Sequence, residues 1–233
     1  MCGRFTHLYK WKDLVRVMRL LSPAAPWPEG EAARYNVAPT QLVPVVRDGD
    51  EGRKAVMMKW GLVPFWADDP GIGNRLINAR SEEAAVKPSF REAAKARRCL
   101  IPVSGFYEWQ PIAGEKVKQP WYIRVKDVPL FAFAGLWERW SREGTTLETF
   151  TILTGKPNAL VAPIHDRMPC IVKPDRYDMW LNTKSDWDDV DTALDVFPAE
   201  EMEAWRVGTR VNSPQNEGED LLTSVEERTP RLF

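Results

Sequence analysis

The sequence predicts an α+β protein, a single domain in which helices surround a central, mostly antiparallel, barrel-like β-sheet. Five strand-like runs lie close together in the middle of the chain, and helical segments come before and after them. This order differs from the strand and helix alternation of parallel α/β folds. A length of 233 residues suits one domain, expected over residues 2–233, and 44% hydrophobic residues can supply its core.

The first part of the chain predicts a helix, a loop and a hairpin. Residues 11–21 (WKDLVRVMRLL) place apolar side chains at helical spacing, which favours an amphipathic core helix. Residues 22–33 (SPAAPWPEGEAA) are rich in proline and predict a loop. Residues 41–48 and 53–60 predict two strands that are joined by a DGDEG turn, so we expect a hairpin there.

The middle of the chain predicts the sheet. Residues 61–80 are rich in glycine and proline and predict a long irregular loop, a kind of segment that often carries function. Residues 81–98 predict two helices broken at Pro88, because acidic residues begin the segment and basic residues end it. The five strand-like runs are residues 99–105, 106–112, 119–125, 129–138 and 147–155. Short helices are expected around residues 175–181, 189–197 and 199–205.

Composition limits the class of protein. The best apolar run, residues 128–137, is shorter than the roughly 18 residues of a membrane span, so we expect no membrane association. Cys2, Cys99 and Cys170 lack paired spacing, and with the two histidines they form no recognisable zinc pattern. We therefore expect no metal or other cofactor, and a reducing, cytoplasmic location.

The net charge of −1 is unevenly spread along the chain. Residues 184–233 are acidic, and the rest of the chain is basic. A basic body permits a local anion-binding face. For the acidic residues 184–220 we favour a solvated surface over a docking site.

The opening MCGRF places Cys2 directly after the initiator methionine. Cysteine is small enough for methionine removal to be expected, and removal would leave a free α-amine beside the thiol. Their pKa values are about 7.7–8.0 and about 8.5, so useful fractions of both nucleophiles exist at neutral pH. The amine can form a Schiff base with an aldehyde, and the thiol can then close a five-membered thiazolidine ring. Cys2 is therefore suited to capturing an aldehyde durably.

Seven motifs then resemble the SRAP family, the SOS-response-associated peptidase proteins that cross-link to abasic sites in DNA. In chain order they are MCGRF, RYNVAPT, WGLVPFW, INARSE, CLIPVSGFYEW, FAGLWE and IHDRMP. The resemblance covers essentially the whole chain, although VNSPQNEGEDLL matches the closing segment of the family only loosely. An abasic deoxyribose opens to an aldehyde, so the resemblance implies a target that agrees with the aminothiol chemistry: single-stranded DNA with abasic sites.

The resemblance implies catalytic roles for four residues. Cys2 would form the cross-link, and Asn78 would hold the nucleophile or the sugar. Glu108 would assist proton transfer, and alternation along its strand places it on the face of Phe106, where desolvation would raise its pKa. His165 would act on the sugar, because its unperturbed pKa of about 6.5 suits protonation of the ring oxygen.

Single-stranded DNA recognition needs phosphate contacts and stacking surfaces. Three arginines lie within two residues of a proposed catalytic position, and the planar guanidinium group suits phosphate oxygens. Two tryptophans are expected beside bases, and three further residues occupy positions that match the family motifs. The expected DNA-binding residues are Arg4, Asn36, Pro39, Trp66, Arg80, Trp109, Thr154 and Arg167.

The sequence leaves other functions open. A cysteine peptidase would use Cys2 as nucleophile and His165 as base, as the family name implies. A non-enzymatic reader of modified bases would need aromatic and arginine side chains but no free α-amine. Abasic-site lyase activity and reversal of the cross-link could accompany trapping. We expect a monomer that associates with the nucleoid when damaged DNA is bound.

Overall fold

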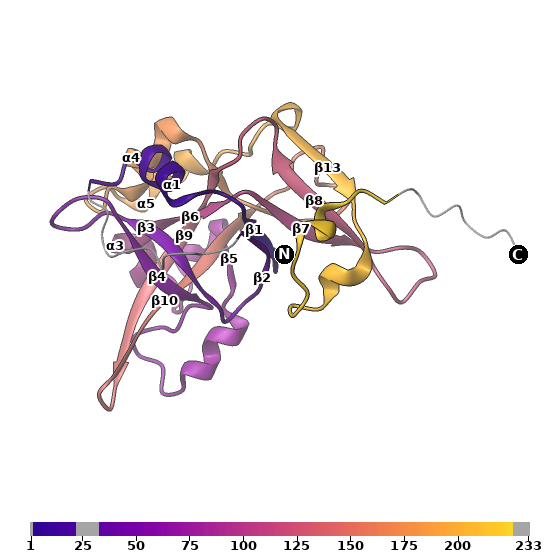
Figure 1. Ribbon diagram of the computed structural model, residues 1–233. Helices are drawn as coiled ribbons and strands as arrows, with labels where there is room; N and C mark the ends of the chain where they lie inside the picture. Colours follow the sequence, from indigo (N-terminus) through magenta and orange to yellow (C-terminus); the bar gives the residue numbers. More distant parts are fainter. Residues whose placement is uncertain (1, 22–32, 226–233) are drawn as a thin grey trace, which may run out of the picture.

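A small closed barrel and a separate five-stranded sheet form the framework of the protein (Figure 1). The computed structural model describes residues 2–21 and 33–225. The predicted loop at 22–33 lies, apart from Ala33, outside the described residues.

The barrel is a ring of five strands. β3 pairs antiparallel with β4 and β6, β6 with β9, and β9 with β10, and a parallel pairing of β10 with β4 closes the ring. The ring strands are β3 (Leu42–Arg47), β4 (Lys54–Trp60), β6 (Arg98–Val103), β9 (Phe131–Arg142) and β10 (Thr145–Gly155). Short strands on its edges are β5 (Asn78–Arg80), β11 (Met168–Pro169) and β12 (Ile171–Val172).

The second sheet has the strand order β13-β8-β7-β1-β2, and all of its pairings are antiparallel. Its strands are β1 (Phe5–His7), β2 (Arg34–Val37), β7 (Gly105–Gln110), β8 (Gln119–Val125) and β13 (Met202–Arg206). The first strand of the chain therefore lies inside a sheet and not at its edge. Residues 211–222 cover one face of this sheet, where Val211 and Leu222 pack against Tyr107 and Tyr122.

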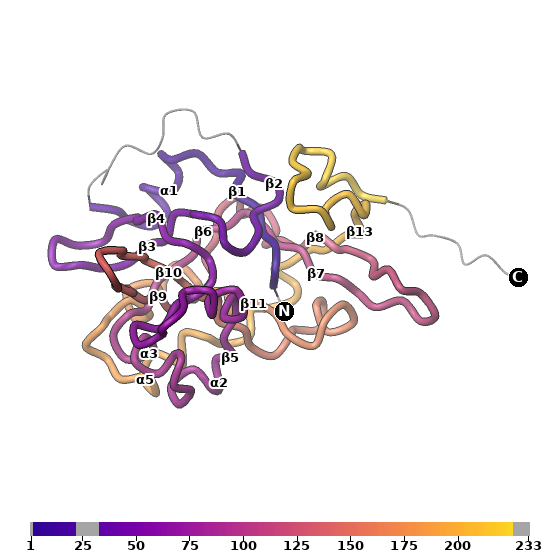
Figure 2. Tube along the Cα trace, turned by 90° about the horizontal axis from the view of Figure 1, so that it is seen from below, coloured from indigo at the N-terminus to yellow at the C-terminus, as the bar shows by residue number. Residues whose placement is uncertain are grey.

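The helices are short. They are α1 (Trp11–Val17), α2 (Ser81–Ala84), α3 (Arg91–Ala96), α4 (Tyr177–Leu181) and α5 (Trp187–Asp191). Figure 2 shows α2, α3 and α5 on one flank of the molecule and α1 on another. The first helix ends earlier than the predicted residue 21, because Arg19 adopts the left-handed region at φ 54°.

Arg98, at the start of β6, joins the helices to the barrel. Its side chain is 1% exposed, and its guanidinium group donates hydrogen bonds only to main-chain carbonyls among the described residues. The acceptors are Ala94, Lys95, Trp180, Asn182 and Ser185. The carbonyls that end α3 and α4, which their own helices leave unpaired, thus receive donors from one side chain.

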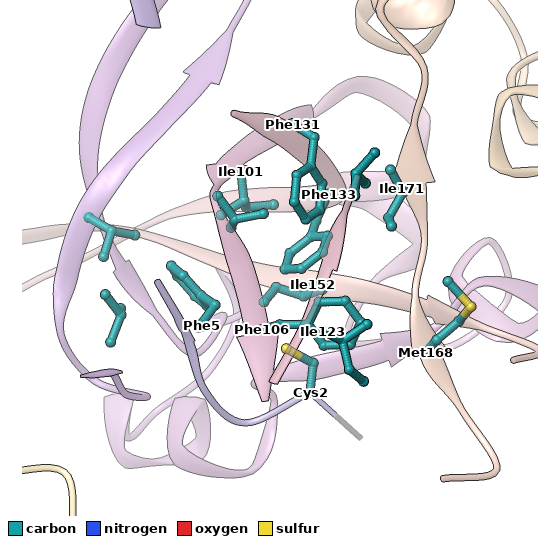
Figure 3. Close-up of a cluster of buried hydrophobic side chains, with 14 of the residues drawn as sticks. Cys2, Phe5, Ile101, Phe106, Ile123, Phe131, Phe133, Ile152, Met168 and Ile171 are labelled. Atoms are coloured by element: carbon teal, nitrogen blue, oxygen red, sulfur yellow. The ribbon is translucent and has the colours of Figure 1, made fainter. Parts of the chain in front are cut away.

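The main hydrophobic cluster joins the barrel interior to the second sheet (Figure 3). Phe5, Phe106 and Ile123 come from the sheet, and Ile101 and Phe133 come from the barrel. Burial of these side chains fixes the sheet against the barrel, since each large apolar side chain contributes about 1.5–3 kcal/mol.

Most predicted elements are confirmed, and one is wrong. The hairpin, the helix pair broken at Pro88 and the five central strands are present. The predicted helix at 199–205 is instead a 3-10 turn at Ala199–Glu201 followed by β13, because Met202–Arg206 pairs along the edge of β8. In the described ranges no helix is long and apolar enough to cross a membrane.

Candidate active site

Cys2 lies at the junction of the barrel and the second sheet. β1 holds it there, because Phe5 pairs with Phe106 and the Tyr107 amide donates to the Arg4 carbonyl at 3.0 Å. The thiol is 0% exposed and points among the buried side chains near Phe106 (Figure 3), and it donates a long hydrogen bond to the Arg4 carbonyl at 3.8 Å. Burial, reinforced by the charge of Glu108, raises the pKa of the Cys2 thiol.

Asn78 binds the main chain of Cys2 directly. Its Nδ2 donates to the Cys2 carbonyl at 2.7 Å. β5 carries Asn78 there by pairing in parallel with β10, where Asn78 lies opposite Ile152. Its Oδ1 is buried and accepts no hydrogen bond from any described residue. A buried unpaired acceptor costs about 1–3 kcal/mol, so the side chain presents an oxygen that a donor arriving beside Cys2 could satisfy.

Glu108 lies on β7 next to the start of β1 and is 1% exposed. It shares a face of the strand with Phe106, as alternation predicts. Burial raises the pKa of the Glu108 carboxyl to about 7, and the Asp166 carboxylate acts in the same direction. A carboxyl group with this pKa exchanges a proton readily at neutral pH.

His165 lies on the loop that joins β10 to β11. Its Nδ1 is 2.8 Å from Asp166 Oδ1 and accepts from the Arg167 amide at 3.1 Å. Burial lowers the pKa of the His165 imidazole, and the Asp166 carboxylate opposes that shift. A neutral ring suits the Arg167 contact, whereas an imidazolium would donate Nδ1–H to Asp166. The Asp166 carboxylate thus acts to raise the pKa of both Glu108 and His165.

Two polar side chains that the sequence analysis missed shape this loop. Asn158 Oδ1 accepts from the Val161 amide at 3.0 Å, while its Nδ2 donates to the Phe197 carbonyl at 2.8 Å. Gln110, two residues after Glu108 on β7, donates to the Pro163 carbonyl at 2.9 Å. Asn158 follows Lys156 and Pro157, a sequence that is typical of an Asx turn. The contact of Gln110 has no such local signal in the sequence.

Arg4 contacts both Asn36 and Trp109 next to Cys2. Arg4 Nη1 donates to Asn36 Oδ1 and to the Val211 carbonyl, both at 2.8 Å, and the guanidinium carbon lies 5.8 Å from the Trp109 ring centroid. Asn36 is fully buried, and its Nδ2 donates to the Ser213 carbonyl at 2.9 Å. These contacts hold the C-terminal segment against β1 and β2. The Asn36 amide is thus engaged with the protein itself.

Arg80, Thr154 and Arg167 form a second group, where β5, β10 and β11 run side by side. Thr154 pairs with Arg80 on β5 and is fully buried. Arg167 donates to both carboxylate oxygens of Glu82 at 2.5 and 2.7 Å and to the Thr154 carbonyl. Arg80 is exposed, 3.4 Å from Glu83. Arg80 lies two residues after Asn78 on β5, and Asn78 binds the Cys2 carbonyl, so this group borders the Cys2 site through β5.

Pro39 and Trp66 lie on two other loops. Pro39 is half-buried between β2 and β3. Trp66 is 46% exposed in the predicted irregular loop, and its neighbour Phe65 is 53% exposed. Two neighbouring aromatic side chains are therefore exposed here, whereas the sequence analysis named Trp66 alone.

The chemical resources of the site are the side chains that surround Cys2. The part of the chain that the structure describes holds no group of three or more His, Cys, Asp or Glu side chains arranged to bind a metal ion. All three cysteines are buried and unpaired with one another. The site therefore offers a buried thiol, a carboxyl group with a raised pKa, an imidazole and flanking guanidinium groups as its chemical resources.

Comparison with known proteins agrees with the motifs. The chain is 43% identical to the "Abasic site processing protein YoqW" of Bacillus subtilis over 96% of this chain and 100% of that protein. It is 29% identical to "Abasic site processing protein YedK" of Escherichia coli over 97% and 100% of the two chains. A crystal structure of a Bacteroides thetaiotaomicron protein superimposes with a TM-score of 0.86 at 27% identity, covering 97% of this chain and 100% of the other. The family model described as "SOS response associated peptidase (SRAP)" matches residues 1–214, and the chain belongs to that family.

Proposed function

We propose that the protein processes abasic sites in single-stranded DNA by trapping their aldehyde on Cys2 after removal of Met1. The convergence of Cys2, Asn78 and Glu108 at one buried position supports this most directly. The names of the relatives, abasic site processing proteins from Bacillus subtilis and Escherichia coli, point the same way.

The reaction proceeds in two steps. The α-amine of Cys2 adds to the C1′ aldehyde to give a carbinolamine, which loses one water and becomes a Schiff base. The Cys2 sulfur then adds to the imine carbon while the thiol proton ends on the imine nitrogen, closing the thiazolidine ring. The overall change is aldehyde plus aminothiol to thiazolidine plus one water. The ring protects the adduct from the hydrolysis to which an open Schiff base is prone.

Glu108 moves the protons that these steps require. In its neutral form it protonates the departing carbinolamine hydroxyl, and as a carboxylate it accepts the thiol proton. A pKa of about 7 keeps both forms available at neutral pH. This help matters most for the thiol, because burial holds Cys2 protonated.

His165 opens the sugar. Opening of the closed abasic deoxyribose places a proton on the ring oxygen, while the C1′ hydroxyl loses a proton. An imidazole whose partner is a carboxylate can exchange these protons near neutral pH. The loop that carries His165 is tied to β7, the strand of Glu108, by the hydrogen bond from Gln110 to the Pro163 carbonyl. Asn78 would orient the residue 2 main chain and present Oδ1 to the amine.

DNA would bind over the two arginine groups. Arg80 and Arg167 would contact phosphates on one side of the site, and Arg4 would hold the DNA backbone close to Cys2. Trp66, with Phe65, would supply a stacking surface, worth about 1–3 kcal/mol for each stacked base. Strand cleavage by β-elimination would compete with ring closure at the Schiff base stage.

The peptidase alternative receives less support. A cysteine peptidase uses a thiolate whose pKa is depressed by a nearby cation. Here burial and the Glu108 charge raise the pKa of the Cys2 thiol. A reader of modified bases would not need Asn78 and Glu108 at the chain terminus.

Intact-mass spectrometry tests the proposal. The protein, prepared so that it begins at Cys2, is incubated with a single-stranded oligonucleotide that carries one abasic site. We expect a heat-stable, one-to-one adduct whose mass is the sum of the two reactants less one water. Cys2→Ser should abolish it, and Cys170→Ser, which removes another buried thiol, should not. A processed protein that forms no adduct, or an adduct that survives Cys2→Ser, refutes the proposal.

A further inference from the structure

A row of side chains runs across three strands of the second sheet, from the active site outward. Glu108 on β7 pairs with Trp121 on β8, and Trp121 pairs with Arg206 on β13. Residues directly opposite each other on neighbouring strands project from the same face of a sheet. Trp121 and Arg206 are half-buried, whereas Glu108 is enclosed, so the row leads from the interior to the surface.

This face is the one that Cys2 lies against. Phe106 and Ile123 pair with each other one step closer to the core and belong to the same hydrophobic cluster as Cys2. Both are drawn beside Cys2 in Figure 3. Glu108 and Trp121 are each two residues from this pair along their strands, and Trp121 packs at the margin of the same cluster.

The row is held rigidly. The Arg206 guanidinium carbon lies 5.3 Å from the Trp121 ring centroid, a cation–π contact that fixes the long side chain. Trp121 Nε1 donates to Gln110 Oε1 at 3.0 Å. Gln110 in turn donates to the Pro163 carbonyl in the loop that carries His165. The aromatic and cationic row is therefore tied to the two elements that supply the proposed acid–base groups.

We infer that Trp121 and Arg206 form a subsite for the nucleotide that flanks the trapped abasic sugar, with its phosphate on Arg206. Neighbouring strands lie about 4.8 Å apart, so Arg206 stands two strand spacings, about 10 Å at its main chain, from Glu108. An arginine side chain that extends from there reaches a phosphate adjacent to a sugar bound at Cys2. Exposed Lys118, the residue directly before β8, adds a cation whose charge lowers the pKa of His165. This inference rests on the proposed function and adds to it a path for the bound DNA strand, from Cys2 across β8 towards β13.

The same sheet contains a matched control on its opposite face. The Arg124 guanidinium carbon lies 5.4 Å from the Trp205 ring centroid, and Arg124 pairs with Glu203 in the β8–β13 register. Trp205 is one residue from Arg206 and Arg124 is three residues from Trp121, both odd offsets, so the two side chains project from the opposite face, away from Cys2. Arg206→Gln and Arg124→Gln thus remove the same charge from similar stacks on two faces.

The test measures fluorescence anisotropy of a labelled single-stranded oligonucleotide that carries a tetrahydrofuran abasic analogue, which has no aldehyde and cannot react. We expect Arg206→Gln to weaken binding several-fold and to reduce the slope of log K against log salt by about 0.7, the value for one lost phosphate contact in a single strand. Arg124→Gln should leave both unchanged. Shortening the oligonucleotide from one end only should erase the difference between Arg206→Gln and wild type.

Two results would overturn the inference: equal losses in both variants, or an Arg206→Gln variant that binds as tightly as wild type with an unchanged salt slope. Comparable melting temperatures establish that both variants are folded. Failure of the wild type to form a covalent adduct with a true abasic site would count against the proposed chemistry alone, because the analogue comparison needs no reaction.

Discussion

Replacement of Glu108 by Gln should stabilise the fold at alkaline pH while it impairs trapping. The Glu108 pKa is about 7 in the folded protein against 4.5 for an unperturbed glutamate. Between these values the unfolded chain is ionised and the folded chain holds a proton, so wild-type stability falls as pH rises through this window. Each pKa unit corresponds to about 1.4 kcal/mol, which gives a loss of about 2–3 kcal/mol between pH 5 and pH 8.

Glu108→Gln keeps the shape of the side chain and removes this titration. Urea unfolding of both proteins at pH 5 and pH 8 gives the measurement, and the free-energy difference between variant and wild type should move in favour of the variant by about 2–3 kcal/mol across that interval. Other titrating groups contribute equally to both proteins and cancel. Adduct formation should slow by about 10²-fold or more, the usual contribution of a positioned acid or base. A difference that is the same at both pH values would show that Glu108 titrates normally and would refute the reasoning.

Three further predictions address other parts of the molecule. Asn78→Ala removes the 2.7 Å hydrogen bond to the Cys2 carbonyl, so adduct formation, followed over time on a denaturing gel, should slow at least tenfold. The free energy of unfolding should fall by only about 1 kcal/mol. An unchanged rate would exclude a positioning role for Asn78. His7→Phe should make the fold less sensitive to acid. Burial lowers the pKa of His7 from 6.5 to about 3, so the wild type loses about 3 kcal/mol of stability as the pH falls from 7 to 4. Parallel profiles of stability against pH for the two proteins would contradict this. Arg98→Met should cost about 3–5 kcal/mol in urea unfolding because it strips donors from carbonyls of two helix ends, and a loss below about 1 kcal/mol would show that water replaces them.

The sequence predicts those parts of the fold whose signals are local. The hairpin of β3 and β4 and the runs that became β6–β10 carry strand-like residues bounded by turns, and the structure confirms them. Alternation also places Glu108 with Phe106 correctly, and its burial and raised pKa follow from that placement. The helix predicted at 199–205 is wrong because its spacing suits a helix, while the edge of β8 that makes Met202–Arg206 a strand lies 77 to 85 residues earlier in the chain.

Long-range partners account for what the sequence analysis lacks at the site. Asn36 was expected to line the DNA-binding surface, yet its amide is enclosed by carbonyls of the segment after Val211. The sequence carries no signal for the contact of Arg206 with Trp121, because neither residue lies in a family motif and the contact depends on the register of β8 with β13. Spacing within a motif identifies chemistry, whereas strand register decides which distant side chain lies next to it.

The position of β1 would hold Cys2 precisely for the proposed chemistry. β1 pairs with β2 on one side and β7 on the other, and Phe5 is buried, so the strand is fixed from residue 4 onward. The described bonds at residue 2 use its carbonyl, which accepts from Asn78, and its thiol, which donates to the Arg4 carbonyl. Neither of these bonds involves the main-chain nitrogen of Cys2. Removal of Met1, which exposes an α-amine at that nitrogen, would therefore preserve both hydrogen bonds. The step that the proposed chemistry needs would then leave these two contacts of the fold unchanged.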